Sequence, residues 1–388
     1  MSSCARQFTR LTLSLFYSFM ILGLTAVVPL PHAMAQSKLA NGLHKRIVAD
    51  YGYWSKYQTP PYGHGQIPYK ELTHINHAGV SFNADGSLSV PDGFIEPELN
   101  NRAHAAGVKV MLLLGGDFGG LETTGAVQTL VDNIAAFEKQ YAYDGVDMDW
   151  EYPETDADRR LLVEIMSRLR KSNPNYVLSI DAPPWQGYGY NLKQLMNSLD
   201  YFNIMMYDCA GPWTQYGQLN SPIFWNKSDP APWECNPGGS AESSATIFLK
   251  VVPPAQLNMG TPFYGYRYLN INAEFGQCPN WVHTPDQECD NAVITMSYAP
   301  AIKILINNPQ YGWQTYYDPV AFVPYMLKTD GSDGYITYDD AFSTYYRTWY
   351  SDWDRGLGGM FMWSLDADYD GHSQDLLSAM YAATVSGH

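Results

Sequence analysis

Three acidic residues spaced two apart stand out in this sequence. Asp147, Asp149 and Glu151 lie in the segment Asp144–Glu151 (DGVDMDWE), which is expected to form a strand. Side chains alternate between the two faces of a strand, so the three carboxyl groups should share one face. Like charges held close together raise at least one pKa, and a carboxylic acid that stays protonated near neutral pH can act as a general acid.

Two plainer roles compete with acid catalysis. A solvated strand face can carry acidic residues, but the segments that flank this one are apolar, and Asp is a poor strand former. Clustered carboxylates can also bind a divalent cation. Acid catalysis is favoured over both roles, and we expect neither a metal nor another cofactor.

The elements that must position these carboxyl groups are short apolar strands alternating with helical segments. The expected strands are 46–51, 72–82, 108–114, 144–151, 176–181, 201–207, 257–263 and 359–363. This alternation predicts an α/β fold, a parallel (β/α)8 TIM barrel, whose chemistry lies at the C-terminal ends of the strands. Glu151, Tyr207, Asp208 and Trp363 fall at such ends.

The interval between the last two expected strands is too long for a single helix. Residues 338–354 can supply the helix, and residues 267–336 are rich in Asn, Pro, Tyr and Trp. We interpret 267–336 as a small α+β insertion between the seventh strand and its helix, forming one wall of a groove. The barrel and its insertion together would make up residues 36–388.

The composition suits a large domain with a polar, acidic surface. The chain has 388 residues, 46% of them hydrophobic, which is enough for a sizeable core. A formal net charge of −16 argues against nucleic acid and anionic membranes as partners. We expect a monomer.

Residues 1–35 have the pattern of a secretory signal. Arg6 and Arg10 precede an apolar run, and Ala33-Met34-Ala35 is a small-x-small cleavage site. An exported protein, extracellular or periplasmic, is therefore predicted, with an uncleaved membrane anchor as the alternative.

Four cysteines remain outside this signal. They are Cys209, Cys235, Cys278 and Cys289. An even number in an exported chain suggests two disulfides, and of the three pairings we favour the neighbours, Cys209–Cys235 and Cys278–Cys289.

The acidic segment also carries a family resemblance. With Tyr152-Pro153, Asp144–Glu151 matches the D-G-x-D-x-D-x-E signature of glycoside hydrolase family 18, the chitinases. Met205–Asp208 resembles the M-x-Y-D motif of the sixth strand in that family, and Gly211 and Trp213 extend it. Thr261–Gly265 and Gly358–Trp363 resemble its seventh and eighth strands.

The resemblance implies a retaining, substrate-assisted mechanism without a second catalytic carboxylate. Glu151 would protonate the glycosidic oxygen, while the N-acetyl carbonyl of the substrate attacks its own anomeric carbon to form an oxazolinium ion. Asp149 would hold the acetamido N–H and share a proton with Glu151, and Asp147 would lie behind Asp149. Tyr207 would orient the acetamido group.

The resemblance also implies which residues contact the sugar. Trp363 would be the apolar floor beneath the distorted ring, and Asp208 would accept a hydrogen bond. The further candidates for substrate binding are Met205, Tyr51, Trp54, Trp213 and Gly116.

The chain departs from the family pattern at three positions. Leu113 replaces the Ser of S-x-G-G on the third strand, Tyr266 stands in place of the Arg of Y-G-R, and Gly79 replaces an aromatic residue. These changes concern substrate contacts rather than the acid. A secreted chitinase that cuts β-1,4 N-acetylglucosamine linkages is the leading prediction. An endo-β-N-acetylglucosaminidase acting on N-glycans and a chitin-binding lectin are the alternatives.

Overall fold

A ring of eight parallel strands forms the centre of the protein. The computed structural model describes residues 43–121, 123–185, 189–230, 239–279, 289 and 292–386. The strands of the ring are β1 (Arg46–Gly52), β2 (His74–Phe82), β4 (Lys109–Gly115), β5 (Gly145–Asp149), β6 (Val177–Ala182), β7 (Tyr201–Ile204), β8 (Leu257–Pro262) and β14 (Gly359–Trp363). Each pairs in parallel with its neighbours, and β1 closes the ring by pairing with both β2 and β14.

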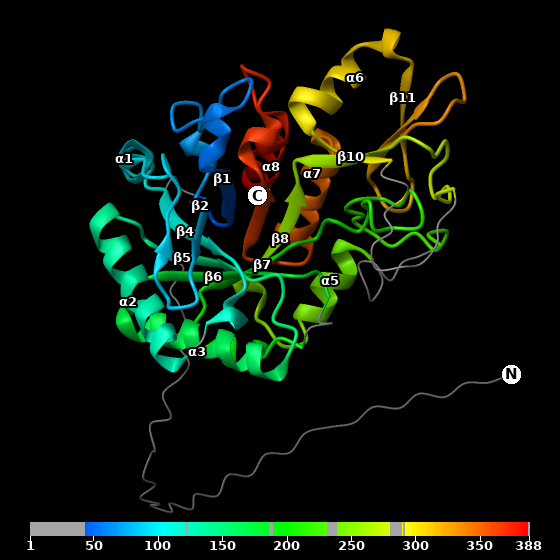
Figure 1. The fold of residues 1–388 in the computed structure, drawn as a ribbon. Helices are drawn as coiled ribbons and strands as arrows, with labels where there is room; N and C mark the ends of the chain where they lie inside the picture. Colours follow the sequence, from blue (N-terminus) through cyan, green and yellow to red (C-terminus); the bar gives the residue numbers. More distant parts are fainter. Residues whose placement is uncertain are drawn as a thin grey trace, which may run out of the picture. The chain divides into compact units, whose positions relative to one another are not determined.

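Helices follow most of these strands and cover the outside of the barrel (Figure 1). They are α1 (Pro97–Ala105), α2 (Thr124–Tyr141), α3 (Asp156–Ser172), α4 (Leu192–Leu195), α5 (Ala241–Phe248), α7 (Ala341–Trp349) and α8 (Asp375–Ser386). Helix α3 begins soon after β5, with Thr155 as its N-cap and Asp158 completing a capping box. None of the helices in the described part of the chain has the length and hydropathy to span a bilayer.

Strand β5 is held tightly between its neighbours, and this explains its sequence. A Cβ atom on Gly145 would lie 1.8 Å from the carbonyl oxygen of Val177, so only Gly lets β5 approach β6 this closely. Val146 and Met148 are buried in the core outside the ring. Asp147, on the alternate face, is completely buried inside it.

A second sheet is inserted after β8, at the C-terminal end of the barrel strands. Its order is β10 (Val293–Ser297), β9 (Tyr264–Tyr268), β13 (Tyr335–Thr337), β12 (Pro324–Lys328) and β11 (Trp313–Tyr317), all antiparallel. Helix α6 (Lys303–Asn307) lies between β10 and β11 in the chain. Figure 1 shows β10, α6 and β11 gathered at one side of the barrel, away from α2 and α3.

The predicted TIM barrel with an insertion between the seventh strand and its helix is confirmed, although two strands end early. Strand β5 ends at Asp149, so Glu151 lies just beyond the strand. Strand β7 ends at Ile204, which places Tyr207 and Asp208 on the loop that follows. The predicted signal, residues 1–35, lies outside the described residues.

Of the two predicted disulfides, the pairing of Cys278 with Cys289 is confirmed, with their Cα atoms 5.6 Å apart. Cys235 lies outside the described residues, and the Cys209–Cys235 pairing stays a prediction.

Candidate active site

Asp147 sits at the bottom of the acidic file, inside the barrel and surrounded by hydrogen-bond donors. Its Oδ1 accepts a 2.5 Å hydrogen bond from the Ser179 hydroxyl, and its Oδ2 accepts one of 2.6 Å from Asn76 Nδ2. Asn203 Nδ2 lies 3.3 Å from both oxygens. Burial raises the pKa of Asp147 to about 6, while the donors oppose that rise by stabilising the ionised form.

Asp149 and Glu151 lie next to each other at the top of this file. The two carboxyl groups are hydrogen-bonded to each other, and the pKa of Asp149 is raised well above its usual range by burial and by the charges of Glu151 and Asp147. Glu151 as a residue is exposed to solvent, but partial burial of its carboxyl group raises its pKa, and the charge of Asp208 adds to the effect. The site therefore retains a proton at a pH where isolated carboxyl groups have lost theirs.

The loop after β7 brings Tyr207 and Asp208 next to these carboxyl groups. Burial, together with several nearby carboxyl groups including Glu151, raises the pKa of Tyr207, so its hydroxyl keeps its proton. Asp208 has a positive φ of 60°, and its backbone N–H donates to Asn220 Oδ1 at 2.9 Å. A left-handed backbone is unfavourable for Asp, and the Asn220 contact helps to hold it.

Two tyrosines of the inserted sheet hold the Asp208 carboxylate. The hydroxyls of Tyr264 and Tyr266 donate to the same oxygen, Oδ1, at 2.5 and 2.7 Å. Both residues are on β9, two positions apart and on one face. Tyr266, which stands where the family pattern has Arg, therefore gives Asp208 a neutral donor instead of a cation.

A pocket of about 340 Å³ opens beside Asp208. It is lined by Trp54, Asp208, Tyr264, Tyr266, Thr295, Ser297, Trp363, Ser364, Asp366 and Ala367. The barrel supplies one side and the inserted sheet the other. Flat apolar rings and hydrogen-bonding groups face each other across it, an arrangement suited to a sugar, which has apolar faces and a polar rim.

Trp54 and Trp363 form the aromatic part of this pocket. Their ring centroids are 6.5 Å apart at an angle of 45°. Trp54 is close to two glycines, because a Cβ on Gly52 or Gly79 would lie 2.4 or 2.9 Å from its indole. Gly79 thus lacks the side chain of the family pattern, and the space above it is filled by Trp54 from the neighbouring strand end.

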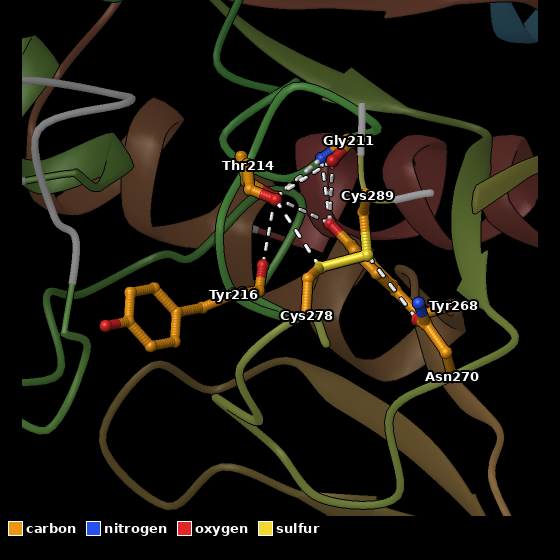
Figure 2. Close-up of a disulfide and its surroundings, with 7 residues drawn as sticks. All are labelled: Gly211, Thr214, Tyr216, Tyr268, Asn270, Cys278 and Cys289. Carbon is orange, nitrogen blue, oxygen red and sulfur yellow. Dashed lines mark hydrogen bonds between the residues drawn. A yellow bond between two sulfur atoms is a disulfide. The ribbon is translucent and has the colours of Figure 1, made fainter. Parts of the chain in front are cut away.

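Trp213 lies on a loop next to the pocket rather than in its lining. It is 44% exposed and packs edge-on against Tyr266, with the ring centroids 5.9 Å apart. The Cys278–Cys289 disulfide lies against this loop, as Figure 2 shows, and the backbone N–H of Cys289 donates to the carbonyl of Pro212 at 2.9 Å. Trp213 is therefore held at the edge of the site, partly exposed to solvent.

The other three predicted sugar contacts lie elsewhere. Tyr51 is completely buried on the outer side of the barrel, where its hydroxyl donates to Glu96 at 3.2 Å. Met205 is buried in a cluster that includes Phe361. Gly116, just after β4, has a positive φ of 142°, and a Cβ there would contact Phe82 at 3.2 Å. None of the three lines the pocket.

Several residues of the site were not predicted from the sequence. Thr295 and Ser297 come from β10, and Ser364 and Asp366 follow Trp363 directly. The alternating tyrosines of β9 were the available signal for Tyr264, whereas β10 carries no pattern that points to a site. Among the described residues, no group of three or more His, Cys, Asp or Glu side chains is arranged to hold a metal ion.

The fold and this site define a class of protein: a TIM-barrel glycoside hydrolase with a file of carboxyl groups where the fourth barrel strand ends. The family model described as "Glycosyl hydrolases family 18" matches residues 46–368. The chain belongs to glycoside hydrolase family 18.

Individual relatives are distant in sequence. "Chitinase B" of Serratia marcescens is 26% identical over 386 aligned positions, covering 80% of this chain and 76% of that protein. "Chitinase A1" of Niallia circulans is 25% identical, covering 86% of this chain and 58% of its own.

Solved structures share the fold. The Ostrinia furnacalis Group IV chitinase in complex with allosamidin superposes with a TM-score of 0.76 at 21% identity, covering 88% of this chain and 99% of its own. Human YKL-39, described as a pseudo-chitinase with retained chitooligosaccharide binding, has a TM-score of 0.75 at 18% identity, covering 88% of this chain and 100% of its own.

Proposed function

We propose that this protein is a secreted chitinase that cuts β-1,4 linkages between N-acetylglucosamine units with retention of configuration. The observations that support this best are the hydrogen-bonded pair of Asp149 and Glu151, whose pKa values are both raised, and the hydrogen-bonded Asp147 carboxylate behind them. A carboxyl group that keeps its proton near neutral pH is what protonation of a glycosidic oxygen requires.

In the first step, Glu151 donates its proton to the glycosidic oxygen and the bond to the anomeric carbon breaks. The carbonyl oxygen of the substrate's own acetamido group forms a bond to that carbon from the opposite face, giving an oxazolinium ion. Before this transfer the two carboxyl groups share the proton through one oxygen of Asp149, and the other oxygen of Asp149 accepts the acetamido N–H. The Tyr207 hydroxyl holds the carbonyl in the attacking position.

In the second step, the Glu151 carboxylate takes a proton from a water molecule as the water adds to the anomeric carbon. The bond to the acetamido oxygen breaks, the oxazolinium ring opens, and the product has the configuration of the substrate. Trp363 and Trp54 would pack against the apolar faces of the sugars, and Asp208 would accept a hydroxyl hydrogen bond.

The test uses chito-oligosaccharides of defined length, with the product anomer followed by NMR. The wild type should release the β-anomer first, and Glu151→Gln should lower kcat about 10²- to 10⁴-fold while binding persists. Glu154→Gln is a matched control, because Glu154 is an exposed glutamate three positions further along the chain. An initial α-anomer would rule out the substrate-assisted scheme.

The same assay separates the alternatives. A chitin-binding lectin would bind the oligosaccharides without cutting them. Cleavage of N-glycoproteins with no product from chito-oligosaccharides would replace chitinase by endo-β-N-acetylglucosaminidase. Export is checked separately by N-terminal sequencing of secreted protein, which should begin at Gln36.

A further inference from the structure

Two more aspartates of the barrel lie beside Asp147 and belong to neither the acidic file nor the pocket. Asp50 is on β1 and Asp181 is on β6, and their side chains are 0% and 4% exposed. No ion pair joins Asp50, Asp147 or Asp181 to a basic side chain within the described part of the chain. Three carboxyl groups thus share a buried space without a cation to balance them.

Hydrogen bonding decides which of the three is ionised. Asp147 accepts from Ser179, Asn76 and Asn203, which come from three different strands, so donors are directed at both of its oxygens. Leu113, which pairs with Asp147 from β4, offers none. A buried carboxylate with this many donors is stabilised in its charged form.

Asp50 has the opposite surroundings. Its Oδ1 accepts one hydrogen bond from Asn76 Nδ2 at 2.8 Å, the same nitrogen that donates to Asp147. Its Oδ2 is buried and has no partner among the described residues. An ionised carboxylate with an unpartnered buried oxygen is costly, so Asp50 is expected to keep its proton.

Asp181 is joined directly to Asp147 by a hydrogen bond between the two carboxyl groups. Such a bond needs one proton. Because Asp147 already accepts from three other groups, Asp181 must be the donor. Burial, first, and the neighbouring carboxyl groups of Asp147, Asp50 and Asp149 raise the pKa of Asp181, and Asn203 opposes them.

We propose that Asp181 is a positioning residue, a neutral acid that donates its proton to Asp147 and keeps Asp147 ionised, with Asp50 as a second neutral acid beside them. The charge on Asp147 in turn keeps the proton on Asp149 and Glu151. This part of the inference rests on the proposed function.

The remaining groups around the cluster are consistent with this assignment. The Tyr207 hydroxyl lies near Asp181 and Asp50, and Tyr201 lies near Asp147; burial raises the pKa of both phenols, so they stay neutral. The guanidinium of Arg46 packs over the Tyr201 ring at 4.6 Å, and its Nε donates to Asn258 Oδ1 at 2.9 Å. Arg46 is therefore engaged outside the cluster.

Two substitutions of Asp181 test the positioning role through the pH dependence of kcat. Asp181→Val removes the donor, so Asp147 should take up a proton more easily, and the charge that holds the proton on Asp149 is lost. The alkaline limb of the pH profile of kcat should then move to lower pH by about one unit, because one hydrogen bond to a charged group changes a pKa by about that much. Asp181→Asn keeps a neutral donor and should leave the limb in place.

Two kinetic outcomes contradict the proposal. If Asp181→Asn moves the limb as far as Asp181→Val, Asp181 is charged in the wild type. If neither variant moves it, Asp181 has no influence on the acid.

Infrared spectroscopy tests the proton on Asp181 without substrate, and it decides the matter even if the Val variant fails to fold. At pH 7 the carbonyl band of neutral carboxylic acids should lose intensity in Asp181→Asn and in Asp50→Asn. It should not change in Asp330→Asn, because Asp330 is exposed and its hydrogen bonds to Ser332 lower its pKa. An unchanged band in Asp181→Asn overturns the proposal. A wild type that cuts no chito-oligosaccharide refutes the proposed function and leaves the infrared result intact.

Discussion

The position of the Trp54 indole over Gly79 allows a prediction of substrate affinity from a single methyl group. A Cβ on Gly79 would lie 2.9 Å from Cζ3 of Trp54, which is at the far end of a side chain that can move. We therefore expect Gly79→Ala to fold normally and to displace the indole by roughly 0.5–1 Å, the distance needed to restore an ordinary contact.

The size of the effect follows from the exposed area of the ring. Trp54 is 38% exposed. A tryptophan side chain has up to about 250 Å² of surface to bury, so a sugar that covered the exposed part of the Trp54 ring would remove roughly 95 Å² from water. At about 25 cal/mol per Å² this contributes about 2 kcal/mol at most, or about 30-fold in affinity. A displacement of this size loses a quarter to a half of the contact energy between the indole and the sugar, so Gly79→Ala should weaken binding about two- to fivefold.

The assay is calorimetric titration of a chito-oligosaccharide in a Glu151→Gln background, where the ligand is not cut. Trp54→Ala should weaken binding up to about 30-fold. Gly65→Ala is the matched control, since a Cβ at Gly65 has nothing within 4 Å and should leave the affinity unchanged.

The double variant provides the decisive comparison. Because Gly79→Ala acts through the indole, it should have no further effect once Trp54 is Ala. The reasoning would be refuted if Gly79→Ala weakened binding equally in both backgrounds, or if it had no effect with Trp54 in place.

Three further predictions concern the acidic cluster and the loop beside it. Tyr266→Phe removes a hydrogen-bond donor from Asp208 and should raise the proton affinity of the Asp208 carboxylate about tenfold. The charge of Asp208 raises the pKa of Glu151, so a weaker charge should move the alkaline limb of the pH profile of kcat to lower pH. Asp147 has a raised pKa of about 6, so its contribution to stability is complete below about pH 4 and is lost as the pH rises through about 6. Urea denaturation at about pH 3 and at about pH 7 should therefore show that the free energy of unfolding of the wild type falls by roughly 3 kcal/mol more than that of Asp147→Asn. Replacing the disulfide by Cys278→Ser should cost about 3 kcal/mol by the same method, and a loss below about 1 kcal/mol would show that the loop is held by its hydrogen bonds alone.

The sequence determined the local features of this protein. The spacing of Asp147, Asp149 and Glu151, two of them on β5 and the third just beyond its end, predicts from the twofold alternation of side chains that their carboxyl groups lie in one file. Alternating apolar and helical segments predicted the barrel, since buried parallel strands have near-continuous apolar sequences. The pairing of Cys278 with Cys289 followed from their closeness in the chain.

Only the tertiary structure decided how distant positions come together. Asp50 and Asp181 are far from Asp147 in sequence, and nothing in their neighbours marks them. Asp181 lies beside Asp147 because β6 pairs directly with β5, whereas Asp50 joins them because the curved sheet closes and brings the inward face of β1 into the same buried space. Likewise, the replacement of an aromatic residue by Gly79 became interpretable only when Trp54, from another strand, was found above it. Local spacing can therefore identify the acid, whereas the charge around it depends on contacts between strands that no short segment of sequence contains.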